Sequence, residues 1–232
     1  MAYDSVYALG MSIGNFKRFK NRLQAGNLLA RELAAYARRA DVILLALPRG
    51  GVPVAAVIAN QLDLALDILV VRKLGFPGQE EFAMGAVASG GACVLQAQTV
   101  KQCHIPDQLI EAALRRELAE IDRREQRYRA GRCVPSLAGR VVILVDDGMA
   151  TGSTMQVAVQ AVRQAHPARV IVAVPVASRE ACAELRSRAD QCLCLITPES
   201  FNAVGEWYDK FEQVSDDEVI SLLEGVAPPP QM

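Results

Sequence analysis

The sequence lacks an apolar stretch long enough to cross a lipid bilayer, although 51% of its 232 residues are hydrophobic. Its formal net charge is only −1, so bulk electrostatics give no reason to expect nucleic-acid binding. The N-terminal segment carries Asp4 early and has no basic region followed by an apolar core, unlike a secretory signal. We therefore expect a cytoplasmic protein with neither a nucleic-acid nor a membrane partner.

The six cysteines are scattered and form no CxxC pair. Cys192 and Cys194 share one face of an expected strand, a pattern that favours reduced, buried thiols over a metal site. The chain also contains no Gly-Lys-Ser/Thr triplet, which excludes a nucleotide-binding P-loop on content.

The most informative segment that is present, VVILVDDGMATGSTM, covers residues 141–155. Its apolar run Val141–Val145 predicts a strand buried on both faces of a parallel sheet. Asp146 and Asp147 follow at the carboxyl edge, where open α/β sheets bind their ligands. Backbone N–H groups and three hydroxyls come next, just before a helix, from Gly148, Met149, Ala150, Thr151, Gly152, Ser153 and Thr154.

This order of residues predicts an anion cradle, with a helix N-terminus facing a phosphate, beside two carboxylates that suit a ribose. The alternative is an ordinary strand–turn–helix joint, because Gly, Ser and Thr are common in such turns. That alternative leaves the adjacent acids beside an anion-binding turn unexplained.

Outside this segment, predicted strands and helices alternate without repeats or linkers, which indicates a doubly wound α/β fold. The other expected strands are 41–47, 66–72, 84–88, 92–96, 169–175 and 191–196, with Gly90-Gly91 closing a hairpin. Expected helices cover 23–39, 52–62 and 107–129, follow the phosphate cradle, begin at Ser178, and start at a Ser215–Glu218 capping box. We expect one domain over 1–226, with a helical insertion at about 107–132 and a disordered tail at 227–232.

The segment resembles the signature of the type I phosphoribosyltransferases, in which two acidic residues precede a Thr-Gly-x-Thr-like phosphate loop. DDGMATGST is especially similar to the adenine enzymes, with Ala150 where hypoxanthine enzymes carry another Asp. FAMGAV, AVPVAS and F-x-x-VG-x-WYDKF further resemble a bacterial group of phosphoribosyltransferases of unassigned substrate, from about Phe19 to Leu223. The chain departs from that group at Asn21, where we expect Asp.

The resemblance implies the type I phosphoribosyltransferase fold, a doubly wound and mostly parallel sheet with a mobile loop at about 74–90 and a hood at about 200–212. It also identifies LPRGGVPVA as a pyrophosphate loop, with Arg49, Gly50 and Gly51 as ligands and a cis peptide expected at Arg49–Gly50. Alone, Gly after a strand is typical of a plain turn.

Arg72 and Lys73, at the start of the expected mobile loop, would neutralise pyrophosphate if the resemblance holds. Without it, they would be solvated charges at a strand end. Asp146 and Asp147 would hold the ribose hydroxyls directly or through Mg²⁺, the expected cofactor. The resemblance adds Asp209 as a further metal ligand.

The acceptor base is expected to stack against Trp207 or Tyr208 in the hood, although aromatic residues of this kind are more often core residues. A general base, if the reaction needs one, is expected at Glu80 or Glu81.

These features predict a Mg²⁺-dependent enzyme that moves the phosphoribosyl group of phosphoribosyl pyrophosphate to a nucleobase or similar nitrogen acceptor. The alternative is a non-catalytic sensor that binds phosphoribosyl pyrophosphate or a nucleotide on the same fold. The expected partners are small molecules, and a homodimer is an open possibility.

Overall fold

The computed structural model describes residues 18–76 and 79–226. At its centre lies a five-stranded sheet with the strand order β2-β1-β6-β7-β8. Every pair of neighbours in this sheet is parallel. Its strands are β1 (Val42–Ala46), β2 (Ala65–Ile68), β6 (Val141–Val145), β7 (Arg169–Val176) and β8 (Gln191–Ile196). The expected parallel α/β architecture is therefore confirmed.

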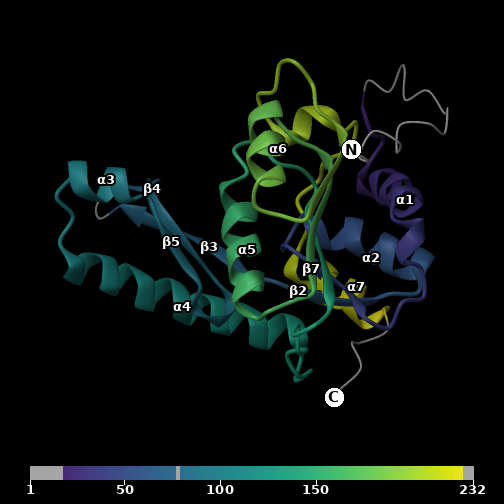
Figure 1. The fold of residues 1–232 in the computed structure, drawn as a ribbon, viewed down its shortest axis with the longest axis horizontal. Coiled ribbons are helices and arrows are strands. Elements are labelled where there is room, and N and C mark those ends of the chain that lie inside the picture. Colours follow the sequence, from purple (N-terminus) through teal and green to yellow (C-terminus); the bar gives the residue numbers. More distant parts are fainter. Residues whose placement is uncertain (1–17, 77–78, 227–232) are drawn as a thin grey trace.

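Helices cover both faces of this sheet, with α1 (Arg22–Glu32) and α2 (Gly51–Leu62) on one side and α5 (Ser153–Gln164) and α6 (Arg179–Arg186) on the other (Figure 1). Alternate residues of each strand face the two layers. Leu44 and Ile143 pack toward α1 and α2, whereas Ile43 and Leu144 pack toward α5 and α6. Both faces are thus apolar, as the unbroken hydrophobic run of β6 predicts.

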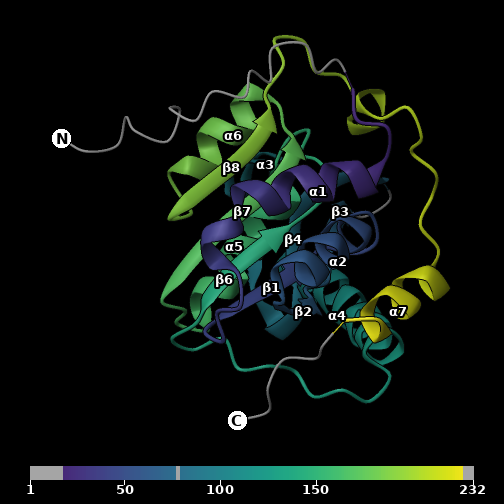
Figure 2. The ribbon, with the colours of Figure 1, turned by 90° about the vertical axis from the view of Figure 1, so that its right-hand side faces the viewer.

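A second, antiparallel sheet of β3 (Val71–Phe76), β4 (Gln79–Ala88) and β5 (Cys93–Leu95) projects from the central sheet together with α3 (Ala97–Gln102) and α4 (Asp107–Arg129) (Figure 1). The bounds of α4 are those predicted from its apolar stripe, and Ile121 and Tyr128 of that stripe are buried. The last helix, α7 (Asp216–Glu224), packs beside α4 and α2 (Figure 2).

The mobility of the segment at about 74–90 stays a prediction; this segment contains parts of the antiparallel strands β3 and β4, with residues 77 and 78 outside the described range. Two other expectations need correction. The segment predicted as one strand over 66–72 forms two, β2 and β3, in different sheets. The helix expected over 23–39 ends at Glu32 and is followed by the short 3₁₀ helix η1 (Ala34–Tyr36).

Other local predictions are confirmed. β4 and β5 pair antiparallel, with Gly85 opposite Leu95, and are joined through η2 (Ser89–Gly91). Ser215 caps α7 by accepting a hydrogen bond from the backbone N–H of Glu218. The expected disordered tail at 227–232 and the N-terminal segment lie outside the described residues.

The unusual Asn21 has a local role that explains why Asn can stand there. Its side-chain oxygen accepts a hydrogen bond from the backbone N–H of Gln24 at 3.0 Å and so caps α1. Asn and Asp are similarly good N-cap residues, so the departure at this position preserves the start of the helix. Among the described helices, none combines the length and apolarity needed to span a bilayer.

Candidate active site at the carboxyl edge of the sheet

The loop after β1 and the acids after β6 meet at one edge of the sheet, because β1 and β6 are parallel neighbours. The backbone N–H of Leu47 donates to the carbonyl of Val145 at 2.9 Å and ties the two strand ends together. A Cβ atom on Gly50 would lie 2.0 Å from Oδ2 of Asp147, and one on Gly51 would lie 2.6 Å from the Val145 carbonyl. Only glycine therefore permits this approach.

The loop's cis peptide bond joins Pro48 to Arg49, one bond earlier than the expected Arg49–Gly50 bond. The side chain of Arg49 reaches toward α7, where its Nη1 atom lies 3.8 Å from Oδ1 of Asp216. Asp216 also accepts a hydrogen bond from the Tyr128 hydroxyl at 2.7 Å. The loop's glycines thus face the carboxylates, while the Arg49 side chain contacts the α4–α7 region.

Asp146 and Asp147 lie side by side at this edge, and the backbone N–H of Asp147 donates to Oδ1 of Asp146 at 2.8 Å. Desolvation raises the pKa of Asp146, and the neighbouring charge of Asp147 raises it further. Desolvation also raises the pKa of Asp147, although Arg22 partly offsets this effect. Asp147 is buried and Asp146 is half-buried, and two neighbouring carboxyl groups of this kind favour a bound cation.

Arg22 is the site residue that the sequence analysis missed. Its Nε and Nη2 atoms both lie 2.8 Å from Oδ2 of Asp147. The same guanidinium lies 3.9 Å from the ring centroid of Phe211, and its Nη1 atom donates to the Glu212 carbonyl at 2.8 Å. The first helix is thereby linked both to a candidate ribose carboxylate and to the end of the hood segment.

The predicted phosphate cradle forms a turn before α5, with Thr151 exposed and Ser153 and Thr154 half-buried. Gly152 is the N-cap residue, with φ of +71°, and has no side chain to cap the helix, whereas the Thr151 hydroxyl accepts a hydrogen bond from the backbone N–H of Ser153 at 3.4 Å. The Thr151 and Ser153 hydroxyls lie 2.9 Å apart. The helix N-terminus therefore offers backbone donors and hydroxyls together.

Contacts with β7 and the start of α6 also hold this turn in place. The backbone N–H of Met149 donates to the Val176 carbonyl at 2.9 Å, and the Ser178 hydroxyl donates to the Ala150 carbonyl at 2.7 Å. A Cβ atom on Gly152 would lie 3.1 Å from that of Ala181 in α6. Contacts of this kind fix the orientation of the cradle.

Arg72 and Lys73 are neighbours on β3, so their side chains leave opposite faces of the sheet. Arg72 contacts α4, where its Nε and Nη2 atoms lie 2.9 Å from Oε2 of the buried Glu117. Lys73 is exposed and pairs in register with Ala86, which packs against Val157 in the second turn of α5. Of the two, Lys73 is on the face that leads to the phosphate cradle.

The hood segment reaches the acids from the C-terminal side. A Cβ atom on Gly148 would lie 2.5 Å from Cγ1 of Val204, at the start of the 3₁₀ helix η3 (Val204–Trp207). The Tyr208 hydroxyl donates to the Asp147 carbonyl at 2.6 Å. Burial raises the pKa of Tyr208, so this hydroxyl remains protonated at neutral pH.

The two aromatic candidates for base stacking differ in their surroundings. Tyr208 is buried, with the rings of Phe19 and Phe211 at centroid distances of 5.4 and 5.0 Å. Trp207 is half-buried and stacks on Phe201 at 6.4 Å. Within the described residues, the Trp207 indole nitrogen is buried without a hydrogen-bond partner. Trp207 is consequently the more accessible of the two.

The predicted metal ligands do not form a closed protein cage. Among the described residues, Asp146, Asp147 and Asp209 are not gathered into a group of three close ligand atoms, and Asp209 is exposed. Such a cage is unnecessary for Mg²⁺, which keeps several waters and binds through one or two carboxylates plus substrate oxygens. The side chains of Glu80 and Glu81 lie outside the described part of the structure.

Comparison with known proteins agrees with this geometry. The model of the phosphoribosyl transferase domain family matches residues 12–211. Two Mycobacterium tuberculosis proteins, from different strains, are named as phosphoribosyl transferases by inference. Each is 44% identical over 208 residues, which cover 90% of this chain and 47% of the relative. The chain thus spans about half the length of these curated relatives.

Among solved structures, TT1426 from Thermus thermophilus is 43% identical, with a TM-score of 0.78 over 90% of this chain and 99% of that one. AQ2163 from Aquifex aeolicus has a TM-score of 0.50 at 12% identity, over 79% of this chain and 78% of that one, and so shares the fold alone.

Proposed function

Because the chain belongs to the phosphoribosyl transferase domain family, we propose that it transfers the 5-phosphoribosyl group of phosphoribosyl pyrophosphate to a nitrogen of a small-molecule acceptor. This proposal rests on one observation, the meeting of two strand ends. Because residue 50 is glycine, the Asp147 carboxylate can contact the loop after β1. Pyrophosphate and ribose are neighbours in the substrate, and so are the two loops proposed to bind them.

The 5′-phosphate binds at Ala150–Thr154 in this proposal. Backbone N–H groups at the start of a 12-residue helix favour an anion, and the three nearby hydroxyls add donors. Binding at this remote phosphate fixes the ribose in place, so part of its binding energy is converted into orientation of the reacting carbon.

Asp146 and Asp147 hold the ribose hydroxyls and favour positive charge on the ring as the glycosidic bond breaks. This adjacent acidic pair fits Mg²⁺, which would supply charge neutralisation to the departing pyrophosphate. Arg22 shares the charge of Asp147 and keeps its carboxylate at a fixed position between α1 and the hood.

In this proposal the pyrophosphate lies against the loop of Gly50 and Gly51, whose missing side chains let the loop approach the two acids. Arg49 adds positive charge at the loop. Lys73 supplies the second charge from β3, because Arg72 is engaged by Glu117 in this structure. The electron pair of the broken carbon–oxygen bond leaves on pyrophosphate, while the acceptor nitrogen's lone pair forms the new bond to the same carbon.

The acceptor lies beside the hood, where Val204 covers Gly148. We assign the stacking contact to Trp207 rather than Tyr208, since the Tyr208 ring already packs on two other rings.

The test is a screen of pyrophosphate release from phosphoribosyl pyrophosphate with Mg²⁺, against nucleobases and small amines. We expect release to depend on one acceptor class and to fall by about 10²-fold or more in the Asp146→Asn/Asp147→Asn variant. Acceptor-independent release, or unchanged release in the folded double variant, would contradict the proposal. Tight binding of phosphoribosyl pyrophosphate without turnover would favour the sensor alternative.

A further inference from the structure

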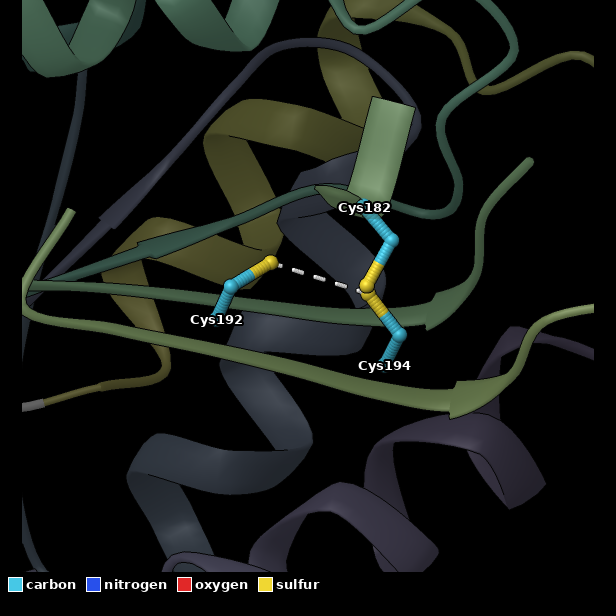
Figure 3. A group of neighbouring side chains, drawn as sticks. All are labelled: Cys182, Cys192 and Cys194. Carbon is cyan, nitrogen blue, oxygen red and sulfur yellow. Dashed lines mark hydrogen bonds between the residues drawn. The ribbon is translucent and has the colours of Figure 1, made fainter. Parts of the chain in front are cut away.

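Half of the chain's six cysteines gather at one place that the proposed reaction does not use. Cys182 lies on α6, and Cys192 and Cys194 lie two residues apart on β8. Their side chains point toward one another between the helix and the strand (Figure 3). The sequence analysis expected Cys192 and Cys194 on one face but did not connect them with Cys182.

The sulfurs lie close enough together to share one metal ion. All three Sγ atoms lie within 4.8 Å of one another, and those of Cys192 and Cys194 are 3.7 Å apart. Metal–sulfur bonds of about 2.3 Å at tetrahedral or trigonal angles place neighbouring sulfurs about 3.8–4.0 Å apart. An ion could therefore bind with only small side-chain movements.

The cluster is both sheltered and reachable. Cys182 is 2% exposed, whereas Cys192 and Cys194 are half-buried on β8, the edge strand of the sheet. The group is thus shielded by the α6 helix on one side and open to an ion from the edge of the sheet.

The ligand set selects the kind of ion. We propose that Cys182, Cys192 and Cys194 form a three-thiolate site for monovalent copper. Thiolates prefer soft ions such as Cu(I) or Zn²⁺. Structural zinc sites are almost always four-coordinate, and the described residues bring no fourth His, Cys, Asp or Glu ligand to the group. Each thiol that binds as a thiolate releases its proton, so apparent affinity should rise with pH.

The site can be tested without any assay of transferase activity. The Cys93→Ser/Cys103→Ser/Cys133→Ser variant removes the cysteines outside the cluster and leaves only the proposed ligands. Under anaerobic conditions, this protein should take up one equivalent of Cu(I) from a chromophoric chelator. X-ray absorption at the copper edge should then report three sulfur neighbours.

The comparison protein adds Cys192→Ser and Cys194→Ser in the same background. It should lose at least about 100-fold in copper affinity, more than is usual for an outer-shell partner of a metal. Copper should raise the thermal midpoint of the background protein only, because an ion stabilises the state that binds it. Thermal unfolding without copper verifies that both proteins are folded.

Three results would overturn the proposal. Copper uptake that survives loss of Cys192 and Cys194 would assign the metal elsewhere. Tighter binding of Zn²⁺ than of Cu(I) by the same thiols would reject the ion assigned here. A thiol titration that finds only one reactive group in the denatured, unreduced background protein would mean that two of the cysteines form a disulfide.

Discussion

Arg22 and Asp147, 125 residues apart in the sequence, form an ion pair in which two guanidinium nitrogens share one carboxylate oxygen at 2.8 Å. Both side chains are largely buried, with 12% and 13% of their surfaces exposed. The pair therefore couples the start of α1 to the edge of the sheet on which the proposed chemistry takes place.

Replacing Arg22 by Met leaves Asp147 without its counter-charge. We expect a loss of about 1.5–3 kcal/mol in the free energy of unfolding, as for a hydrogen bond to a charged group. Urea unfolding measures this loss, and the matched control Arg31→Met, at an exposed position of the same helix, should lie within about 0.5 kcal/mol of the parent. If Arg22→Met costs no more than Arg31→Met, the pair has no structural role.

Adding a methyl group at Gly50 should damage the site more than the fold. The new carbon would start 2.0 Å from Oδ2 of Asp147, so loop and carboxylate must separate. We expect a loss of about 1–3 kcal/mol in stability and no measurable turnover in Gly50→Ala. Gly225→Ala is the control, because its Cβ would meet nothing closer than 3.6 Å and should leave both quantities nearly unchanged. Full activity in Gly50→Ala would refute the proposed approach of the two loops.

Lys73 and Arg72 should contribute differently to substrate binding. Removing the exposed charge in Lys73→Met is expected to weaken binding of phosphoribosyl pyrophosphate by about tenfold to 100-fold at unchanged stability. Arg72→Met instead breaks the contact with buried Glu117 and should mainly lower stability. Isothermal titration and urea unfolding separate the two effects, and the reverse pattern would show that Arg72 leaves Glu117 to bind the substrate.

An oxyanion should occupy the cradle before α5. A structure determined in phosphate is expected to contain the anion within hydrogen-bonding distance of backbone N–H groups between Ala150 and Thr154. Crystals soaked at several phosphate concentrations show how the occupancy of the anion depends on its concentration. Phosphate bound only elsewhere, with this turn unchanged, would contradict the assignment.

The buried pair of Arg129 and Asp67 should matter for stability alone. Arg129 Nε lies 3.1 Å from Oδ2 of Asp67, and both residues line a cavity of about 720 Å³ that includes none of the proposed site residues. Arg129→Met should cost about 3–5 kcal/mol because it leaves Asp67 buried without a partner. The exposed pair of Arg123 and Glu120 supplies the control, Arg123→Met, whose cost should stay below about 1 kcal/mol. Equal losses of stability in the two variants would show that burial does not strengthen the pair of Arg129 and Asp67.

The sequence predicted best where one local pattern determines the structure. The apolar run of β6, the acids after it and the turn before α5 are contiguous, and the structure preserves their order and the bounds of β6. The same holds for α4, whose stripe of apolar residues needs no information from distant parts of the chain.

Features that depend on distant partners were missed. Nothing near Arg22 in the sequence indicates Asp147, and Cys182 belongs to a different element from Cys192 and Cys194. The predicted strand ended at Arg72, because Gly75, Pro77 and Gly78 are turn residues. The strand nevertheless continues through Gly75 to Phe76, with shifts in register at Leu74–Gly75 and Gly75–Phe76.

The bridge between Phe19 and Tyr208 joins segments near the two ends of the described chain. The backbone N–H of Phe19 donates to the Trp207 carbonyl, and that of Asp209 donates to the Phe19 carbonyl, each at 2.8 Å. During synthesis the N-terminal half emerges first, and contacts of such long sequence separation form late. On the ribosome, β1 and β6 are therefore synthesised before Tyr208, whose hydroxyl binds the Asp147 carbonyl. The proposed site can be complete only after the hood has been synthesised.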